Sequence, residues 1–432
     1  MSLILPETVS SASHAVAITQ DATDVSWSEL RSAVDRLASQ LLPLRGRRVA
    51  LTTRRAVDVA AALLAAEQSG TGLLLLRSGQ PPFPSDWNVS GSIREGLDLA
   101  ADASRPTGSD AGEFELLLTT SGTTGTPKVA RHSLTALLGR IRAPRAGDPP
   151  ARWLLTYHPA TFAGLQVLLT SLRSGAHLIA STAGTVADLA QAAQRLLPTH
   201  VSGTPTFWRA FVPSLSAEPR RSIRQITLGG EAVDQATIEL LRRTFPDAAL
   251  THIYASTEAG SLFAVKDGRA GFPAAWLETG VEGARLRIRD GMLELCSPRA
   301  MRGYAGTAAA EADRWIATGD LVERRGDRVF FAGRHDTILN VGGAKVTPEE
   351  VEAALLELPG IVEARVYGRP SPITGTVLAA DIVPEPGADP QELRARVVAR
   401  LGSSLERHKV PRLINVVASI GLSAAGKKQR DL

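Results

Sequence analysis

Hydroxyl side chains and glycines are concentrated in one stretch of the first third of the chain, which ends at a lysine. The stretch reads Thr119-Thr120-Ser121-Gly122-Thr123-Thr124-Gly125-Thr126-Pro127-Lys128. Glycine allows successive backbone N–H groups to turn toward one anion, and the hydroxyls and the lysine supply further hydrogen-bond donors. These groups suit a polyphosphate. A Walker A loop is excluded, because only two residues separate Gly122 from Gly125 and a proline precedes Lys128. A surface turn is the alternative interpretation.

The elements that position this stretch are predicted from hydrophobic periodicity. An apolar run at residues 114–118 predicts a buried strand that leads into it. Upstream, residues 48–52, 57–70 and 72–76 predict a strand, a helix and a strand, which is the order of a parallel βαβ unit. Residues 77–112 are rich in Pro, Gly, Ser and Asp, and we expect loops there with room for one helix.

Downstream of the stretch, predicted helices and strands alternate up to residue 254. Short strands separated by turns such as Asp290-Gly291 and Gly326-Asp327 follow, and they predict a smaller, distorted β-barrel. Beyond residue 336 the alternation resumes on a smaller scale, with helices predicted at 348–358 and 389–405. This order of elements predicts an α/β protein.

Composition and charge exclude several classes of protein. The 432 residues are long for one domain and suit two unequal ones. The net charge is only +4 and the arginines are scattered, so we expect no nucleic-acid partner. The single cysteine, Cys296, excludes an internal disulfide and a cysteine-based metal cluster, and we expect it to fill the core. No apolar run approaches about 18 residues and residues 1–20 lack a signal-peptide pattern, so we expect a cytoplasmic protein with no membrane span.

The order S-G-T-T-G-x-P-K at residues 121–128 resembles the phosphate loop of the adenylate-forming superfamily, which includes acyl-CoA synthetases, luciferases and peptide-synthetase adenylation domains. Further segments resemble motifs of the same superfamily, in the same order, so that the resemblance covers almost the whole chain. They are Gly229-Gly230-Glu231, Tyr254-Ala255-Ser256-Thr257-Glu258, Thr318-Gly319-Asp320, residues 333–352 and residues 422–430.

The resemblance implies a site for ATP and Mg²⁺. The donors of Thr120, Ser121, Gly122, Thr123, Thr124 and Gly125, with Lys128, would hold the β- and γ-phosphates. The adenine would lie against Gly230, Glu231 and Tyr254. Ala255, which replaces the usual glycine, and Ser256 would lie beside it.

Thr257 would meet the phosphates, and Glu258 would hold the metal, a hard cation that prefers oxygen ligands. Asp320 would accept two hydrogen bonds from the ribose diol, and Arg334 would contact the ribose or a phosphate. Taken alone, a glutamate at a strand end is more often a solvated charge.

The C-terminal motifs imply a mobile domain that carries the catalytic lysine. Asp336 occupies the hinge position of the superfamily, so we place domains at residues 1–335 and 336–432. The family lysine falls on Lys427, which would bridge the substrate carboxylate and the α-phosphate. Rotation about the hinge would then withdraw Lys427 and present the Gly342-Gly343 loop for attack by a thiol. A disordered basic tail is the alternative interpretation of Lys427.

The acyl pocket is poorly encoded in the sequence. Segments that line it in related enzymes contain Phe162, Gly203, Thr204, Phe207 and Gly229. Thr161 or Phe162, rather than His158, falls where many members carry a histidine, and His158 is equally well explained as a core residue. Phe162, Phe207 and Trp208 predict a compact, flat pocket. The short chain resembles small aryl-type ligases such as O-succinylbenzoate–CoA ligase, so we favour an aromatic or short acid over a long-chain fatty acid.

Three functions compete at this stage. The first is ATP-dependent activation of a small acid followed by transfer to CoA. The second keeps the adenylation but passes the product to carrier-protein phosphopantetheine or an amine, or activates a small inorganic acid such as nitrite. The third is a non-catalytic relative that only binds nucleotide, and the intact Lys427, Glu258 and Asp320 argue against it. The sequence leaves the acid, the acceptor and the oligomeric state open.

Overall fold

The structure is a computed structural model that describes residues 2–5, 14–77, 89–101, 114–120, 128–142, 149–307, 313–371, 375–423 and 426–428. Seven residues of the expected phosphate loop, 121–127, lie outside the described residues, and they include the predicted site residues Ser121, Gly122, Thr123, Thr124 and Gly125. The element order is α/β, as predicted. No helix in these ranges is long and apolar enough to cross a membrane.

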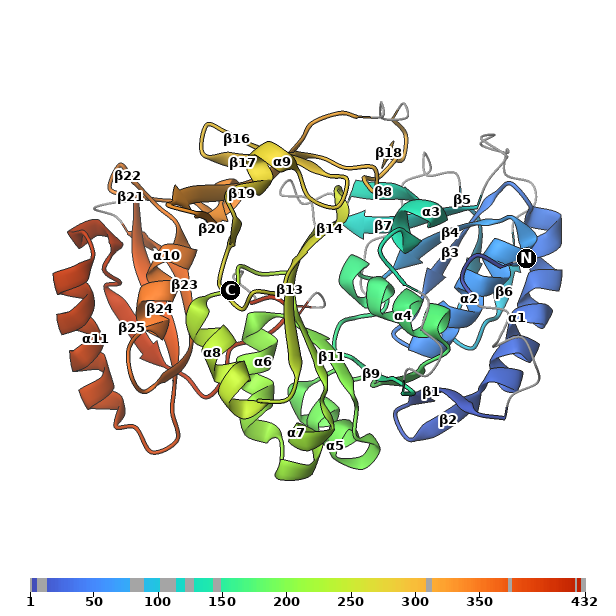
Figure 1. Cartoon of the computed structure of the whole chain (residues 1–432), viewed down its shortest axis with the longest axis horizontal. Coiled ribbons are helices and arrows are strands. Elements are labelled where there is room, and N and C mark those ends of the chain that lie inside the picture. The colour runs from blue at the N-terminus through green and yellow to red at the C-terminus, as the bar shows by residue number, and fades with distance from the viewer. Residues whose placement is uncertain are drawn as a thin grey trace.

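A seven-stranded sheet with the order β18-β8-β7-β4-β3-β5-β6 lies toward the N-terminal end of the molecule (Figure 1). Its strands are β3 (Arg48–Thr52), β4 (Gly72–Leu76), β5 (Val89–Ile93), β6 (Leu99–Ala101), β7 (Glu115–Thr120), β8 (Lys128–Ser133) and β18 (Gly303–Tyr304). Strands β3 and β4 are parallel and are joined by α2 (Ala56–Ser69), which confirms the predicted βαβ unit. The alanine-rich α2 is buried on nearly all sides because α1 (Trp27–Leu41) packs against it.

The prediction of loops and a helix over residues 77–112 is wrong for the described part of that segment. There, β5 extends the sheet in parallel beside β3, and β6 pairs with β5 in the antiparallel direction. Strand β5 has the sequence Val-Ser-Gly-Ser-Ile, whose small polar residues give no clear alternation. Its conformation depends on pairing with β3 rather than on local preference.

An eight-stranded sheet with the order β14-β13-β12-β11-β9-β10-β1-β2 forms the middle of the molecule. Its strands are β1 (Val16–Gln20), β2 (Thr23–Ser26), β9 (Arg152–Leu155), β10 (His177–Ala180), β11 (His200–Gly203), β12 (Gln225–Leu228), β13 (Ala249–Ser256) and β14 (Gly260–Val265). The helices between them are α3 (Leu134–Leu138), α4 (Phe162–Ser174), α5 (Val186–Leu196), α6 (Pro205–Phe211), α7 (Ala217–Ser222) and α8 (Gln235–Thr244). Strands β9, β11, β12 and β13 are parallel, so their carboxyl ends meet at one edge. The segments that begin at Thr204, Gly229 and Thr257 all leave this edge.

The region predicted as a distorted β-barrel contains a five-stranded antiparallel sheet with the order β15-β20-β19-β17-β16. Its elements are β15 (Phe272–Pro273), α9 (Trp276–Thr279), β16 (Arg285–Arg289), β17 (Met292–Cys296), β19 (Ile316–Arg325) and β20 (Arg328–Arg334). Cys296 is buried in this layer, as expected of a core residue. The sheet presents Asp320 and Arg334 as directly opposed residues of β19 and β20.

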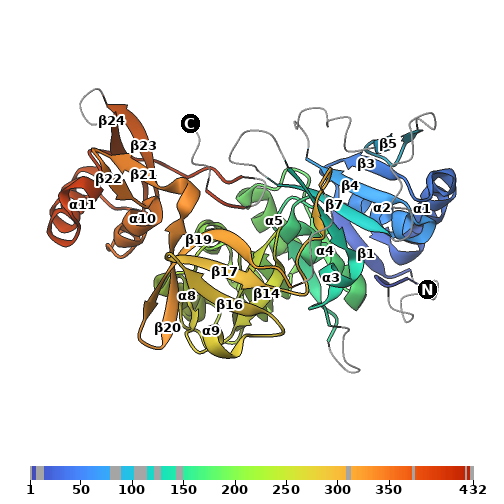
Figure 2. The same ribbon diagram turned by 90° about the horizontal axis from the view of Figure 1, so that it is seen from above.

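The C-terminal unit, defined here as β21 to β25 with α10 and α11, has its own hydrophobic core. Its elements are β21 (Leu339–Val341), β22 (Ala344–Val346), α10 (Pro348–Leu356), β23 (Ile361–Ser371), β24 (Gly375–Pro384), α11 (Pro390–Ser404) and β25 (Leu413–Val416). Figure 2 shows this unit and the N-terminal sheet at opposite ends of the molecule. A short 3₁₀ turn, His335–Thr337, joins it to β20.

Candidate active site

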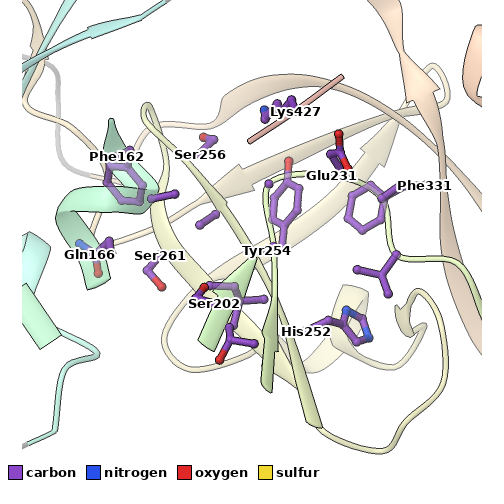
Figure 3. Close-up of a pocket in the computed structure, with 18 of the residues that line it drawn as sticks. Phe162, Gln166, Ser202, Glu231, His252, Tyr254, Ser256, Ser261, Phe331 and Lys427 are labelled. Atoms are coloured by element: carbon purple, nitrogen blue, oxygen red, sulfur yellow. The ribbon is translucent and has the colours of Figure 1, made fainter. Parts of the chain in front are cut away.

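One cleft, with a volume of about 2450 Å³, collects most of the residues predicted from the motifs. It lies where the carboxyl ends of the central sheet face β20, α10 and the last described residues of the chain. Among the residues that line it are Thr120, Phe162, Gly229, Gly230, Glu231, Tyr254, Ala255, Ser256, Thr257, Glu258, Asp320, Arg334, Asp336 and Lys427. Figure 3 shows Tyr254 in the middle of this cleft, with Lys427 at one end and Gln166 and Ser261 at the other.

Asp320 is the centre of a polar cluster on one wall of the cleft. The Tyr254 hydroxyl donates to one carboxylate oxygen of Asp320, and Arg334 Nη1 contacts the other at 3.1 Å. Arg334 also donates from Nε to Asp336 at 2.9 Å. Burial raises the pKa of the Asp320 carboxyl above its usual range, even though the Tyr254 hydroxyl and Arg334 oppose the shift. A diol could replace the Tyr254 hydroxyl or Arg334 as a hydrogen-bond partner, because the Asp320 carboxylate is already oriented toward the cleft side chains that surround it.

The Tyr254 ring is held by two aromatic side chains. Its centroid lies 5.4 Å from that of Phe263 and 5.0 Å from that of Phe331, and both pairs are stacked. Burial, followed by the neighbouring Asp320, keeps the pKa of the Tyr254 hydroxyl well above its usual value, so it acts as a donor. The residue is half-buried and lines the cleft, as a residue that contacts a flat base must.

The other predicted anion and metal groups flank the described ends of the phosphate loop. Thr120 and Lys128 are opposed residues of β7 and β8, so they define where the loop begins and ends. Lys128 Nζ lies 5.4 Å from the centroid of the Tyr304 ring. The Tyr304 hydroxyl donates to Glu258 Oε1 at 3.4 Å, and burial, followed by the charge of Glu258, raises the pKa of Tyr304 to about 12. The sequence motifs did not point to Tyr304, which reaches the site only because β18 pairs with β8.

The segment around Lys427 is packed into the cleft rather than projecting as a tail. Its two flanking residues are tied to the central sheet: Thr204 Oγ1 donates to Gly426 O at 2.5 Å, and Lys428 N donates to Glu231 Oε1 at 3.1 Å. Lys427 itself is exposed to the cleft, and a Cβ atom at Gly230 would lie 3.7 Å from its Cε. Its positive charge is one of the influences that oppose the rise in the pKa of Asp320 caused by burial.

Two aromatic residues expected in the acyl pocket lie elsewhere. Phe207 and Trp208 are 2% and 0% exposed, and neither lines the cleft. Phe207 stacks on Phe211 with centroids 4.8 Å apart, and a Cβ atom at Gly203 would lie 2.4 Å from its ring. Thr204 is also buried, and it contacts Gly426 rather than open space. The expectation of a compact, flat pocket formed by these residues is therefore corrected: they form the core behind β11.

The end of the cleft beside α4 carries polar side chains among apolar ones such as Trp153 and Val167. Phe162 and Gln166 of α4 border it on one side, and Ser202 and Ser261 on the other (Figure 3). Gln166 Nε2 donates to Leu137 O at 3.1 Å, which leaves its carbonyl oxygen as an acceptor. Helix α4 is placed by Thr161, whose hydroxyl accepts from Gly164 N at 3.2 Å as an N-cap. Large apolar acids do not require such a lining.

His158 does not line the cleft. Its Nδ1 accepts from Ala160 N at 3.1 Å, and its Nε2 is buried without a hydrogen-bond partner among the described residues. Burial, followed by Arg54 and Arg77, lowers the pKa of His158 to about 4, so the imidazole is neutral at physiological pH. These features fit a structural residue before α4, one of the two interpretations left open by the sequence.

Comparison with known proteins identifies the family. The model of the AMP-binding enzyme family matches residues 78–304, and that of the AMP-binding enzyme C-terminal domain matches residues 350–427. The first of these covers more than half of the chain. The chain therefore belongs to the AMP-binding enzyme family, and the resemblance inferred from the motifs is confirmed.

Individual relatives are distant. The chain is 28% identical to part of a protein named as the probable non-canonical nonribosomal peptide synthetase CymA of Salinispora arenicola, over 96% of this chain and 6% of that protein. It is also 28% identical to the 3-hydroxybenzoate–CoA ligase of an Aromatoleum species, over 72% of this chain and 64% of the ligase. It thus spans less than two thirds of either relative. The solved o-succinylbenzoate CoA synthetase of Bacillus subtilis shares the fold, with a TM-score of 0.70 and 20% identity over 96% of this chain and 94% of that chain.

Proposed function

We propose that this protein activates a small aromatic carboxylic acid with ATP, releases pyrophosphate and transfers the acyl group to CoA. The observation that supports this most directly is the convergence of Lys427, Asp320 and Glu258 on one cleft, although they come from three separate parts of the chain. A protein that only bound nucleotide would not need an exposed lysine in that cleft whose two neighbouring residues are both hydrogen-bonded to the large unit.

The proposed chemistry brings two anions together, the substrate carboxylate and the α-phosphate of ATP. Such a reaction is accelerated mainly by charge neutralisation and by alignment of the reacting groups. Lys427 would supply a positive charge between the anions. Asp320 and Arg334 would hold the ribose, Tyr254 the adenine, and the 120–125 loop with Lys128 the outer phosphates.

The residues present fit a magnesium ion held mainly by phosphate oxygens. The described residues include no group of three or more His, Cys, Asp and Glu side chains able to bind a metal. Mg²⁺ often keeps several waters and binds through one or two carboxylates together with substrate phosphates. Glu258, held by the Tyr304 hydroxyl, would be that carboxylate. When bound, the ion would neutralise charge on the triphosphate.

The polar side chains at the α4 end of the cleft, set among apolar ones, support an aromatic acid with a hydroxyl or amino substituent rather than an alkyl chain. Gln166 offers an acceptor, and Ser202, Thr227 and Ser261 also line the cleft. Arg140 lies at the same cleft and pairs with Glu282 at 2.8 Å, while its Nη1 is buried with no hydrogen-bond partner among the described residues. A hydroxybenzoate or aminobenzoate would satisfy such groups, and the match to a 3-hydroxybenzoate–CoA ligase points the same way.

A carrier-protein thiol is the second candidate acceptor. The match to CymA, a peptide synthetase, extends over 96% of this chain and favours it. Both acceptors require that the small domain change orientation after adenylation. We propose that this domain begins at residue 336, so that the His335–Thr337 turn is the hinge and residues 1–335 form the large domain.

Pyrophosphate release tests the proposal. The protein is supplied with ATP, Mg²⁺ and one acid at a time: benzoate, 3-hydroxybenzoate, 2-aminobenzoate, ferulate, hexanoate or palmitate. The reaction is then repeated in the presence of CoA or of a phosphopantetheinylated carrier protein, and the products are analysed by mass spectrometry. We expect release with substituted aromatic acids. The matched control is Lys427→Ala, which should slow release by on the order of 10²–10³ while ATP still binds. No release with any acid, or normal release by Lys427→Ala, would contradict the proposal.

A further inference from the structure

Lys428, the residue after the proposed catalytic lysine, is buried. Its side chain is only 7% exposed. The Nζ atom contacts Glu352 of α10 at 3.1 Å, Glu363 of β23 at 2.9 Å and the carbonyl oxygen of Ala364 at 2.6 Å. Burial by itself lowers the pKa of this amine, but the charges of Glu352 and Glu363 outweigh it and the pKa is raised. Lys428 is therefore a charged anchor inside the C-terminal unit.

The same anchor is connected to the central sheet. Glu363 also accepts from Arg209 of α6, with Nε to Oε2 at 2.8 Å and Nη2 to Oε1 at 3.3 Å. The side chains of Arg209 and Glu363 are 9% and 7% exposed. Burial raises the pKa of Glu363, but Arg209 and Lys428 together lower it below its usual value. Two buried cations thus share one buried carboxylate across the boundary between the two units.

The main chain on either side of Lys427 is fixed by the large unit. Lys428 N donates to Glu231 Oε1 at 3.1 Å, while Glu231 Oε2 accepts from the Thr206 hydroxyl at 2.7 Å. Gly426 O accepts from Thr204. Gly426 has φ +68°, and a Cβ there would lie 3.3 Å from the Tyr157 ring, so this close approach favours glycine. The side chain of Lys427 is therefore exposed, while the backbone is fixed by hydrogen bonds at the residue before it and at the residue after it.

We propose that Lys428 is a positioning residue for the adenylation step: its buried ammonium, shared among Glu352, Glu363 and Ala364, fixes where the Lys427 amine stands in the cleft. The inference rests on the function proposed above, in which Lys427 is the catalytic lysine. Lys428 also borders the cleft, but its amine is engaged by Glu352, Glu363 and the carbonyl oxygen of Ala364, so we assign it no contact with a substrate atom. Its effect is transmitted through one peptide unit to Lys427.

The ion pairs also allow the C-terminal unit to separate from the large unit. Separation of the two units breaks the Arg209–Glu363 pair and the hydrogen bonds from Lys428 N to Glu231 and from Thr204 to Gly426 O. After it, Arg209 keeps Asp234 at 3.0 Å and Thr237 at 2.5 Å, and Glu363 keeps Lys428. No charge of this network is left buried without a partner, which is the main cost of breaking such a pair. The contacts therefore hold Lys427 in one position and can still be broken and formed again.

Lys428→Met tests the inference, because methionine keeps the length of the side chain and removes the charge. With the fastest acid of the panel, we expect the rate of pyrophosphate release at saturating ATP to fall by about 10–100-fold, since a misplacement of about 1 Å can cost 10²-fold. ATP affinity by calorimetry should change by less than about 3-fold, because the Lys428 ammonium is engaged by Glu352 and Glu363 rather than by the nucleotide. The reaction of CoA with chemically prepared acyl-adenylate should be unchanged, since it does not use Lys427.

Lys409→Met is the matched control. Lys409 lies in the same unit and pairs with Glu350 at 2.7 Å, but the two side chains are 20% and 41% exposed. Exposed pairs contribute little, so every rate should stay at the wild-type value. Lys428→Arg keeps the charge and should recover most of the adenylation rate. Glu363→Gln, which keeps acceptor atoms but loses the charge, is a second test should Lys428→Met fail to fold, and it should show the same selective loss of adenylation.

Three results separate the possible failures. Normal pyrophosphate release by Lys428→Met or Glu363→Gln would overturn the inference about Lys428, provided that Lys427→Ala is slow. Parallel loss of ATP affinity, adenylation and acyl transfer would also overturn it, because that pattern indicates a structural role only. Normal release by Lys427→Ala would instead contradict the proposed function itself.

Discussion

Gly319 combines a special backbone conformation with a close contact to the proposed nucleotide site. Its φ is +77°, and a Cβ atom there would lie 3.0 Å from Arg334 Nη2 and 3.6 Å from Cζ. Gly319→Ala therefore has two effects. The left-handed backbone costs about 1 kcal/mol for an alanine. The new methyl group also displaces the Arg334 guanidinium, which Asp320 and Asp336 hold at 3.1 and 2.9 Å.

We expect Gly319→Ala to raise the KM for ATP about tenfold, equivalent to about 1.4 kcal/mol, because Arg334 and Asp320 no longer present their paired geometry to the ribose. The control is Gly326→Ala, in the turn between β19 and β20. Gly326 has φ +60°, but no atom lies within 4 Å of its Cβ position. Both variants should lower the Tm by roughly 2–4 °C, since they share the backbone strain.

The assay is ATP–pyrophosphate exchange at varied ATP concentration, together with a thermal melt of each variant. A selective rise in KM for Gly319→Ala supports the assignment of Asp320 and Arg334 to the nucleotide. Equal KM values for the two variants would refute it, because the strain would then be the whole effect. An unchanged KM in Gly319→Ala would show that the nucleotide does not depend on this wall of the cleft.

Three further predictions follow from the same geometry. Glu258→Gln should shift the Mg²⁺ titration of activity to higher concentration, because it removes the charge that holds a hard cation, and an unchanged titration would place the metal elsewhere. Asp336→Pro should slow acyl transfer far more than adenylation in paired single-turnover measurements, because proline fixes φ at the proposed hinge and restricts His335 before it. Equal slowing of both steps would indicate misfolding. Burial lowers the pKa of His132 from 6.5 to about 4, so stability is lost as the pH falls below 6.5. His132→Phe should remove about 2 kcal/mol of the loss between pH 6.5 and about 5 in urea unfolding, and an identical pH dependence would exclude His132 as its source.

Local order along the chain was predictable where the physical cause is local. The apolar run before Thr119 predicted β7, and the alternating elements 48–76 predicted the parallel unit that contains α2. The motifs at Gly229 and Tyr254 could be placed at strand ends because a predicted hydrophobic strand precedes or contains the start of each, whereas Thr318 was recognised only from the resemblance and lies inside β19. Parallel strands end at one edge, so the convergence of two of these segments on one cleft followed from the order of elements.

The acyl side of the cleft was not predictable in the same way. Phe207 and Trp208 have the residue types of a flat pocket, but their exposure depends on what packs over α6. Phe211 and Phe245 lie against Trp208, with ring centroids 5.9 and 5.7 Å away. An aromatic side chain is equally suited to a core and to a pocket wall, and the local sequence does not specify which residues pack over it.

By itself, the sequence determined the family, the α/β order and the residues proposed to meet the nucleotide, because these depend on short ordered motifs and on strand ends. Only the tertiary structure decided the environment of each charge. Lys427 and Lys428 are adjacent and chemically identical, yet one is exposed in the cleft and the other is buried between two glutamates. Their difference arises from Glu352 and Glu363, which lie 76 and 65 positions away from Lys428 in the chain. Pairing at such separations is set by how α10 and β23 pack, and no local pattern of residues specifies it.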